Sequence, residues 1–278
     1  MTNNSTKNYV KYYEGNLPII LSAPHGGDEK PTDIKTRKKG VFEKDDFTFE
    51  LTEEIIKQFQ MQVNKTPYCV IATISREKVD INRNITDAFF DEKASIAYNQ
   101  FHSLIKKARV QARKEFKKGL YFDIHGQSHS HGFIEFGYLL NNDILKLKKK
   151  RLKKYKNSSS IKTLSNFSSK SFIKQLKGKN SLGSLMSKKG FKSIPSKHIP
   201  YTKDENYFEG AFNTFKYGSL DGGVINGIQV EFPYKNCRDS KKNRKKCAKA
   251  FVKAVIKFSK IHLGIDLKSN PYNCRTPS

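Results

Sequence analysis

The stretch LPIILSAPHGG at residues 17–27 combines an apolar run with a histidine and two glycines. Residues 17–23 are apolar except for Ser22, which is typical of a strand that is buried on both faces of a sheet. The glycines that follow predict that the strand ends at the edge of the sheet. His25 therefore lies just beyond a buried strand, where we expect the side chains of a binding site.

Strands and helices alternate along the chain after this stretch. Further apolar runs predict strands at 68–74, 119–124, 132–140 and 224–232. Apolar residues at helical spacing predict helices at 47–59, 92–117 and 242–259, the first of them with Asp45 or Asp46 near its N-cap. This order favours a three-layer α/β/α domain, in which helices cover both faces of a mixed, mostly parallel sheet.

The length of 278 residues favours one large domain over two small ones. We expect a polar, frayed segment at 1–16, a single domain at 17–265 and a tail at 266–278. The domain contains a lysine-rich insertion at about 141–180, in which eight of the eleven positions from 146 to 156 are Lys or Arg and serine-rich sequence follows. This composition predicts a solvated excursion that is partly helical or mobile.

Basic residues exceed acidic ones strongly, with 53 Lys and Arg against 26 Asp and Glu and a formal net charge of +27. Such a charge attracts polyanions, although an excess spread over much of the chain is also typical of an ordinary lysine-rich surface. Nonspecific polyanion contact is therefore expected through Lys146–Lys156. Only Tyr155 within that run could stack on a nucleic-acid base.

The cysteines and the N-terminus indicate the cellular setting. Cys69, Cys237, Cys247 and Cys274 form no CxxC motif, although the last three could include a disulfide. The first twenty residues lack the apolar core of a signal peptide, and no apolar run reaches the length of a membrane span. We therefore expect a soluble protein and favour the cytoplasm.

Two histidines and a carboxylate are candidates for a metal site. His25 and His125 both follow predicted strands, and a catalytic zinc ion takes three ligands of the His, Asp or Glu type and leaves a fourth position for water. Spacing alone does not choose among Asp28, Asp45 and Asp46 as the acidic ligand. Asp123 would project to the same face of its strand as His125 and could orient the imidazole ring.

Other polar residues are candidates for the chemistry around such a metal. Glu231 is the sole acidic residue in the run VINGIQVEF and is a candidate general base, although a salt bridge would equally explain it. Arg76, Asn82 and Arg83 occur together in SREKVDINRN. Fixed guanidinium groups suit the binding of a carboxylate and the stabilisation of an oxyanion, although loop arginines of a basic protein usually face solvent.

The whole set of motifs resembles the N-formylglutamate amidohydrolase family, whose fold is similar to that of zinc carboxypeptidases (phosphorylase/hydrolase-like) and aspartoacylase. The similar stretches span roughly Leu17 to Arg238. They are SAPHGG (22–27), KDDFTFEL (44–51), ATISREKVDINRN (72–84), YFDIHGQSH (121–129), SLGSLMSKKGFKSIPS (181–196) and YFEGAFNTFKYGSLDGGVINGIQVEFP (207–233). The HGQSH and YFEG motifs indicate a subgroup distinct from the enzymes of histidine degradation.

The resemblance implies one zinc ion bound by His25, Asp45 and His125, and it favours Asp45 because Asp45 and Thr48 match the family's spacing. Glu231 would deprotonate a zinc-bound water, and Arg76 would polarise the scissile carbonyl. By the same likeness, Asn82 and Arg83 would hold a substrate carboxylate. These roles describe a zinc-dependent hydrolase of an amide bond in an N-acyl or N-formyl amino acid or a similar small carboxylate-bearing substrate.

Two alternatives to this function remain at the level of sequence. A metallocarboxypeptidase-like peptidase would use the same site with a larger pocket for a peptide substrate. A polyanion-binding protein with a vestigial metal site would use the lysine-rich insertion instead, and its binding would fall steeply with salt.

Overall fold

The computed structural model describes residues 7–203 and 207–269, and within them seven strands form one mixed sheet. The strands are β1 (Val10–Tyr13), β2 (Ile19–Ala23), β3 (Tyr68–Ala72), β4 (Gly119–Gln127), β5 (Ile134–Gly137), β6 (Ser193–Ile194) and β7 (Ile225–Pro233). Their order is β1-β3-β2-β4-β7-β5-β6. The four central strands β3, β2, β4 and β7 run parallel, whereas β1 and β5 run antiparallel to β3 and β7. The predicted mixed, mostly parallel sheet is confirmed.

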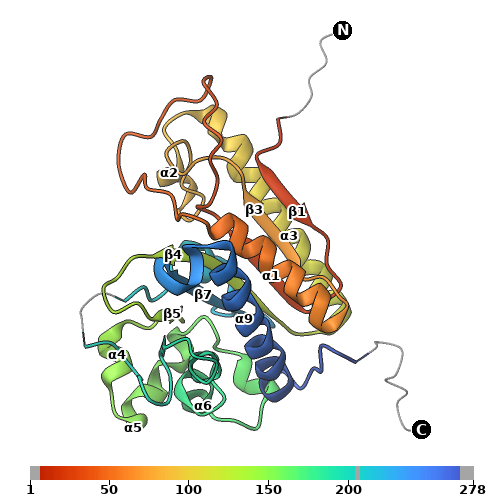
Figure 1. Ribbon diagram of the computed structural model, residues 1–278, viewed down its shortest axis with the longest axis vertical. Helices are drawn as coiled ribbons and strands as arrows, with labels where there is room; N and C mark the ends of the chain where they lie inside the picture. Colours follow the sequence, from red (N-terminus) through yellow and green to blue (C-terminus); the bar gives the residue numbers. More distant parts are fainter. Residues whose placement is uncertain (1–6, 204–206, 270–278) are drawn as a thin grey trace.

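Helices cover both faces of this sheet. They are α1 (Thr48–Val63), α2 (Ile85–Ala88), α3 (Ser95–Phe116), α4 (Asn142–Lys146), α5 (Lys149–Leu152), α6 (Phe172–Lys177), α7 (Leu182–Ser187), α8 (Phe212–Tyr217) and α9 (Lys241–His262). Helices α1 and α9 lie side by side on one face, and α3 lies on the other (Figure 1). Successive side chains of a strand point to opposite faces, so Leu120 and Phe122 join the core under α1 and α9, while Tyr121 joins the core under α3.

The direction in which the chain winds reverses between β2 and β4. From β2 the chain passes through α1 to β3 on one side, and from β3 it passes through α3 to β4 on the other side of β2. Neighbouring strands at such a point leave a crevice at their carboxyl ends, because their connections lead away in opposite directions. His25 follows β2 and His125 lies near the end of β4, so the sheet brings both to this crevice.

The predicted elements are present, with shifted ends at several of them. The helix predicted at 47–59 is α1, but its N-cap is Phe47, which has a left-handed backbone and no side-chain capping bond. The aspartates before it therefore do not cap the helix. The strand predicted at 119–124 continues to Gln127, so His125 lies inside β4 and not after it.

The interpretation of residues 1–16 as a frayed segment is wrong for the part that the structure describes. Residues 10–13 form β1, which pairs with the outer edge of β3, with Val10 opposite Ala72. Tyr9 and Val10 are buried there. A strand of four residues at an edge buries too few side chains to give a clear apolar pattern in the sequence.

The lysine-rich insertion is an ordered part of the domain. Helices α4, α5 and α6 and two short 3₁₀ helices at Lys153–Ser158 and Leu164–Phe167 lie within it, so its predicted helical part is present. Leu145, Leu152 and Phe172 pack into the same core as α1 and α9. A solvated excursion is therefore the wrong description, because the apolar residues between the lysines anchor the segment.

The question of a disulfide among the late cysteines is answered for the described residues, where Cys69, Cys237 and Cys247 are free and buried. Cys274 lies outside the described residues. Over the same part of the chain, no helix has both the length and the hydrophobicity needed to cross a membrane.

Phe251 of α9 lies in the core under α1 and α9 and provides a test of how the helices pack on the sheet. Its buried ring lies 5.3 Å from that of Phe122 and 5.6 Å from that of Phe232, between centroids. We expect Phe251→Ala to lower the free energy of unfolding by about 3–5 kcal/mol, because it leaves a cavity between α9 and the sheet. Phe215→Ala, at a side chain that is 61% exposed, should change it by less than about 0.5 kcal/mol. Chemical denaturation of both variants measures this, and equal effects would contradict the arrangement.

Candidate metal centre

Backbone contacts bring the segment before α1 to the turn after β2. The N–H of Asp45 donates to the carbonyl of His25 at 3.0 Å, and the N–H of Gly126 donates to Oδ2 of Asp45 at 3.1 Å. Gly26 makes this approach possible, because a Cβ at that position would lie only 2.7 Å from the backbone nitrogen of Phe49. The carboxylate of Asp45 is thereby fixed over the ends of β2 and β4.

His25, Asp45 and His125 form a group that could hold a metal ion. One ligand atom from each lies within 4.8 Å of the others. Oδ2 of Asp45 lies 3.1 Å from Nδ1 of His125 and 3.7 Å from Nδ1 of His25. Asp28 lies apart from this group, since its exposed carboxylate pairs with Lys44 at 2.6 Å.

Each of the two histidines has a buried carboxylate behind it. Nε2 of His25 lies 2.7 Å from Oδ1 of Asp80, and Nε2 of His125 lies 2.9 Å from Oδ2 of Asp123. A carboxylate only accepts, so these contacts place a proton on Nε2 of each ring. Nδ1, the nitrogen turned to Asp45, is then the one that can bind a cation once it carries no proton. Nδ1 of His25 is buried and has no hydrogen-bond partner among the described residues. The geometry therefore fits a metal ion.

The low pKa values of Asp45 and Asp80 keep both carboxylates ionised beside the histidines. Burial would raise the pKa of Asp45, but hydrogen bonds with His125 and His25 outweigh it and keep that pKa well below its usual range. Burial would likewise raise the pKa of Asp80, but His25 and Arg76 keep it low. Burial also acts to lower the pKa of His125, but Asp123 and Asp45 outweigh it, and that pKa is raised well above its usual value.

Glu231 lies beside His125 in the sheet. The two residues are partners in the register of β4 and β7, and on the other side Glu231 pairs with Glu135 of β5. Burial raises the pKa of Glu231 to about 8, with further contributions from Asp45 and Glu135. A carboxyl group with a pKa near neutrality, adjacent to a candidate metal ligand, is suited to accept and return a proton.

Three further residues that the sequence singled out lie close to the group. Arg76 binds Oδ2 of Asp80 through Nε at 3.2 Å and Nη2 at 3.1 Å. Asn82 is buried, with its side-chain oxygen accepting from the N–H of Asn213 at 2.8 Å and its Nδ2 lying 3.2 Å from Nε2 of His125. Arg83 has a side chain that is 52% exposed, with Nε 3.6 Å from Asp80. Their roles with a substrate stay predictions.

A second group of possible metal ligands, which the sequence analysis missed, consists of His129, His131 and Glu135. Glu135 is buried and accepts from the N–H of Phe208 at 2.7 Å, while Nδ1 of His129 lies 2.6 Å from it. Nδ1 of His131 accepts from the N–H of Phe133 at 3.0 Å, so the proton of a neutral ring is on Nε2, 3.2 Å from Glu135. This group therefore holds the segments at 129–133 and 208 against β5, and it fits a cation less well than the first. The HSH motif was its only sequence signal.

Arg238 was also missed. Its buried guanidinium donates to the carbonyls of Phe232 and Gln127 at 3.0 Å each and to the carbonyl of Asp46. Arg238 also helps to offset the negative charges of Asp45 and Glu231. It is an isolated arginine beyond the motifs, and nothing in its spacing distinguishes it from the many surface cations.

Comparisons with known proteins support the fold. No protein-family model matches the chain, and no similar sequence was found among curated proteins. An N-formylglutamate amidohydrolase from Ralstonia eutropha JMP134 is similar in structure, with a TM-score of 0.58 and 11% identity over 93% of this chain and 100% of that one. A gene product of Agrobacterium tumefaciens matches with a TM-score of 0.51 and 12% identity over 90% and 95%. The predicted resemblance is thus confirmed in architecture.

The carboxylate behind His25 gives a test of the centre. We expect Asp80→Asn to weaken zinc binding by roughly 10- to 100-fold, because a neutral amide accepts from Nε2–H of His25 more weakly than the carboxylate and orients the ring less firmly. Asp28→Asn, at the rejected candidate position, should leave the affinity unchanged. Calorimetric titration of zinc into the chelator-treated protein measures both. Loss of affinity in Asp28→Asn with none in Asp80→Asn would contradict the assignment.

Zinc binding at pH 7 should release at least one proton. The raised pKa of His125 keeps its imidazole protonated without a cation, and a metal ion can take Nδ1 only after that proton has left. The affinity should therefore fall as the pH falls. Titrations in buffers of different ionisation enthalpy count the released protons, and a heat that does not depend on the buffer would refute this expectation.

Proposed function

We propose that this protein is a zinc-dependent hydrolase of an amide bond in an N-acyl or N-formyl amino acid or a similar small substrate with a carboxylate. The observation that carries the proposal is the orientation of the two histidine rings. In each ring Nδ1 is turned to Asp45, while Nε2 forms a hydrogen bond with a buried carboxylate. Glu231 is buried beside them in the sheet. The shared fold with a solved N-formylglutamate amidohydrolase supports it.

The ligand set supports zinc over other common ions. Two imidazole nitrogens and one carboxylate oxygen are the donors of many catalytic zinc sites, whereas magnesium and calcium prefer oxygen donors alone. Three protein ligands also leave a position for water or substrate. His25, Asp45 and His125 would hold the ion.

Glu231 would carry the proton transfers. A bound zinc ion would polarise the carbonyl of the substrate and lower the pKa of a water molecule. Glu231, whose pKa of about 8 would fall beside a bound cation, would then accept a proton from that water as a carboxylate. After attack on the amide carbon, the same carboxyl group would return the proton to the departing amine nitrogen.

Arg76, Arg83 and Asn82 would bind and polarise the substrate. Arg76 lies between Asp80 and Asp45, with Nη1 3.8 Å from Oδ1 of Asp45, and would stabilise the developing oxyanion. Arg83 has its guanidinium largely free and would bind the substrate carboxylate. The side-chain oxygen of Asn82 already accepts from the N–H of Asn213, which favours a role in supporting the site alongside the predicted contact with substrate.

A metallocarboxypeptidase-like activity would use the same residues with a larger substrate. A panel of formyl, acetyl and longer acyl derivatives of one amino acid, together with short peptides, separates the two by the size at which kcat/KM falls. A polyanion-binding protein with a vestigial metal site would hydrolyse none of them.

Replacement of Glu231 tests the mechanism. We expect Glu231→Gln to reduce hydrolysis by roughly 100-fold or more while zinc remains bound, because the amide has the shape of the carboxyl group but accepts no proton. Glu115→Gln makes the same chemical change at an exposed position of α3 and should retain full activity. Both variants are assayed on N-formyl and N-acetyl amino acids with metal analysis in parallel. Full activity of Glu231→Gln would exclude the proposed role.

A further inference from the structure

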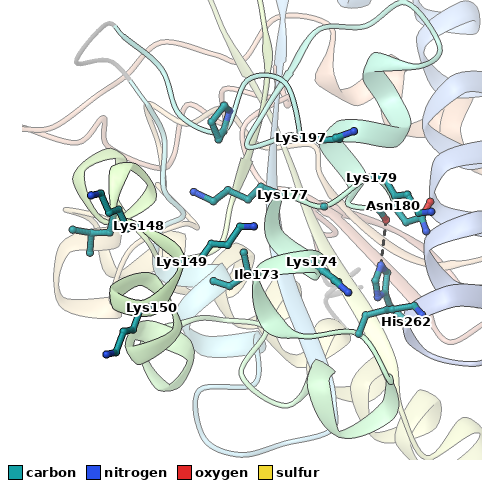
Figure 2. A pocket seen from close by; sticks show the side chains of 14 residues that line it. Lys148, Lys149, Lys150, Ile173, Lys174, Lys177, Lys179, Asn180, Lys197 and His262 are labelled. Carbon is teal, nitrogen blue, oxygen red and sulfur yellow. Dashed lines mark hydrogen bonds between the residues drawn. The ribbon is translucent and has the colours of Figure 1, made fainter.

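A pocket of about 1070 Å³ is lined by parts of the insertion, the segment after β6 and the end of α9 (Figure 2). Eight of its fourteen lining residues are lysines, and none is acidic. The lysines are those at 148–150, 170, 174, 177, 179 and 197. The run that the sequence marked as basic thus supplies only three of them, and the fold adds five from elsewhere.

The positive charges of this pocket are largely unbalanced. Within the part of the chain that the structure describes, seven of the eight ammonium groups make no ion pair or hydrogen bond. The exception is Lys177, whose Nζ donates to the carbonyl of Leu145 at 2.8 Å. Burial and the nearby charge of Lys149 lower the pKa of Lys177. Like charges gathered on a concave surface repel one another and create a strong positive potential there. This potential would attract an anion, whose binding would relieve the repulsion.

The pocket lies at the other end of the sheet from the metal centre. Helix α9 ends at His262, and Gly264 just beyond it lies near the side chain of Lys118, which directly precedes β4. The wall of the pocket at His262 therefore lies where β4 begins, whereas His125 and Glu231 lie where β4 and β7 end. None of the metal-centre residues lines the pocket, so it is a separate site.

One wall of the pocket is neutral and fixed. Nε2 of His262 bonds to the carbonyl of Asn180 at 3.2 Å, and burial lowers the pKa of His262 to about 4 (Figure 2). The apolar residues Leu147, Ile173 and Pro200 complete the lining. Seven of the eight lysines lie on α5 and α6 or within two residues of them, and the end of α9 adds the neutral His262 to this ordered frame.

The chemistry of the lining favours clustered phosphates over nucleic acid. Ammonium groups bind phosphate oxygens as point charges and require no planar geometry. The lining contains no Phe, Tyr or Trp, so it offers no ring of that kind on which a base could stack. The volume is that of a small-molecule site and not of a long groove for a duplex.

We propose that this pocket binds an anion with several closely spaced phosphate groups and no aromatic ring. Such phosphates could belong to a linear polyphosphate or to a phosphorylated polyol, and both present the same chemistry to the lysines. The proposal is independent of the metal centre, because it uses neither its residues nor its end of the sheet.

The test is calorimetric titration of the full-length protein with inorganic tripolyphosphate and, in a second arm, with inositol hexakisphosphate. We expect saturable binding of one ligand per chain, weakening as salt rises, with at least one of the two probes. The tighter arm identifies the linear or the cyclic arrangement of phosphates. Glu231→Gln should bind the same probe unchanged, so failure of the hydrolase proposal would not affect this result.

Matched variants separate the pocket from general surface charge. Lys149→Gln combined with Lys174→Gln removes two charges from the pocket at exposed positions and should weaken binding by 10-fold or more. Lys242→Gln combined with Lys245→Gln removes two exposed charges from α9 outside it and should have little effect. Equal weakening by both pairs, no saturable binding, or tighter binding of single-stranded DNA than of either probe would overturn the proposal.

Discussion

The candidate metal centre depends on the two buried carboxylates that stand behind its histidines. Asp80 and Asp123 fix which nitrogen of each imidazole carries a proton, and thereby turn both Nδ1 atoms toward Asp45. Burying these charges is costly unless each is paired and hydrogen-bonded. Arg76 offsets the charge of Asp80, and the hydroxyls of Ser22 and Tyr121 donate to Asp123. The polar interior beneath the centre thus serves to orient two rings.

The register of the sheet explains why the candidate site residues meet. His125, Glu231 and Glu135 are partners across β4, β7 and β5, so their side chains project to the same face at the same level. A shift of one residue in any strand would turn its group to the opposite face, into the core under α1 and α9. The apolar residues that alternate with them, such as Val230, fix the register by packing into that core. The chemistry of the site is therefore tied to core packing.

The sequence predicts the local features of this protein better than the long-range ones. Apolar runs and helical periodicity suffice for the central strands and the long helices, since each buries many side chains. The choice of Asp45 could not be made from spacing, because it follows from a backbone contact between Asp45 and His25. Asp80 and Glu135 were missed for the same reason: their partners come from other strands and loops. Asp123, two residues from its histidine, could be predicted from the alternation of a strand.

Charge shows the same limit of sequence reasoning. The net charge of +27 states by how many the basic side chains exceed the acidic ones, but not where they gather. Seen along the chain, Lys197 is separated from Lys149 by most of the insertion, and neither is distinguished from other surface lysines. Folding brings them to one concavity without an acidic neighbour in its lining. A solvated surface needs no such arrangement, because separated lysines repel one another less. The concentration of charge in a frame anchored by Leu152 and Phe172 is therefore better explained by a bound anion than by composition alone.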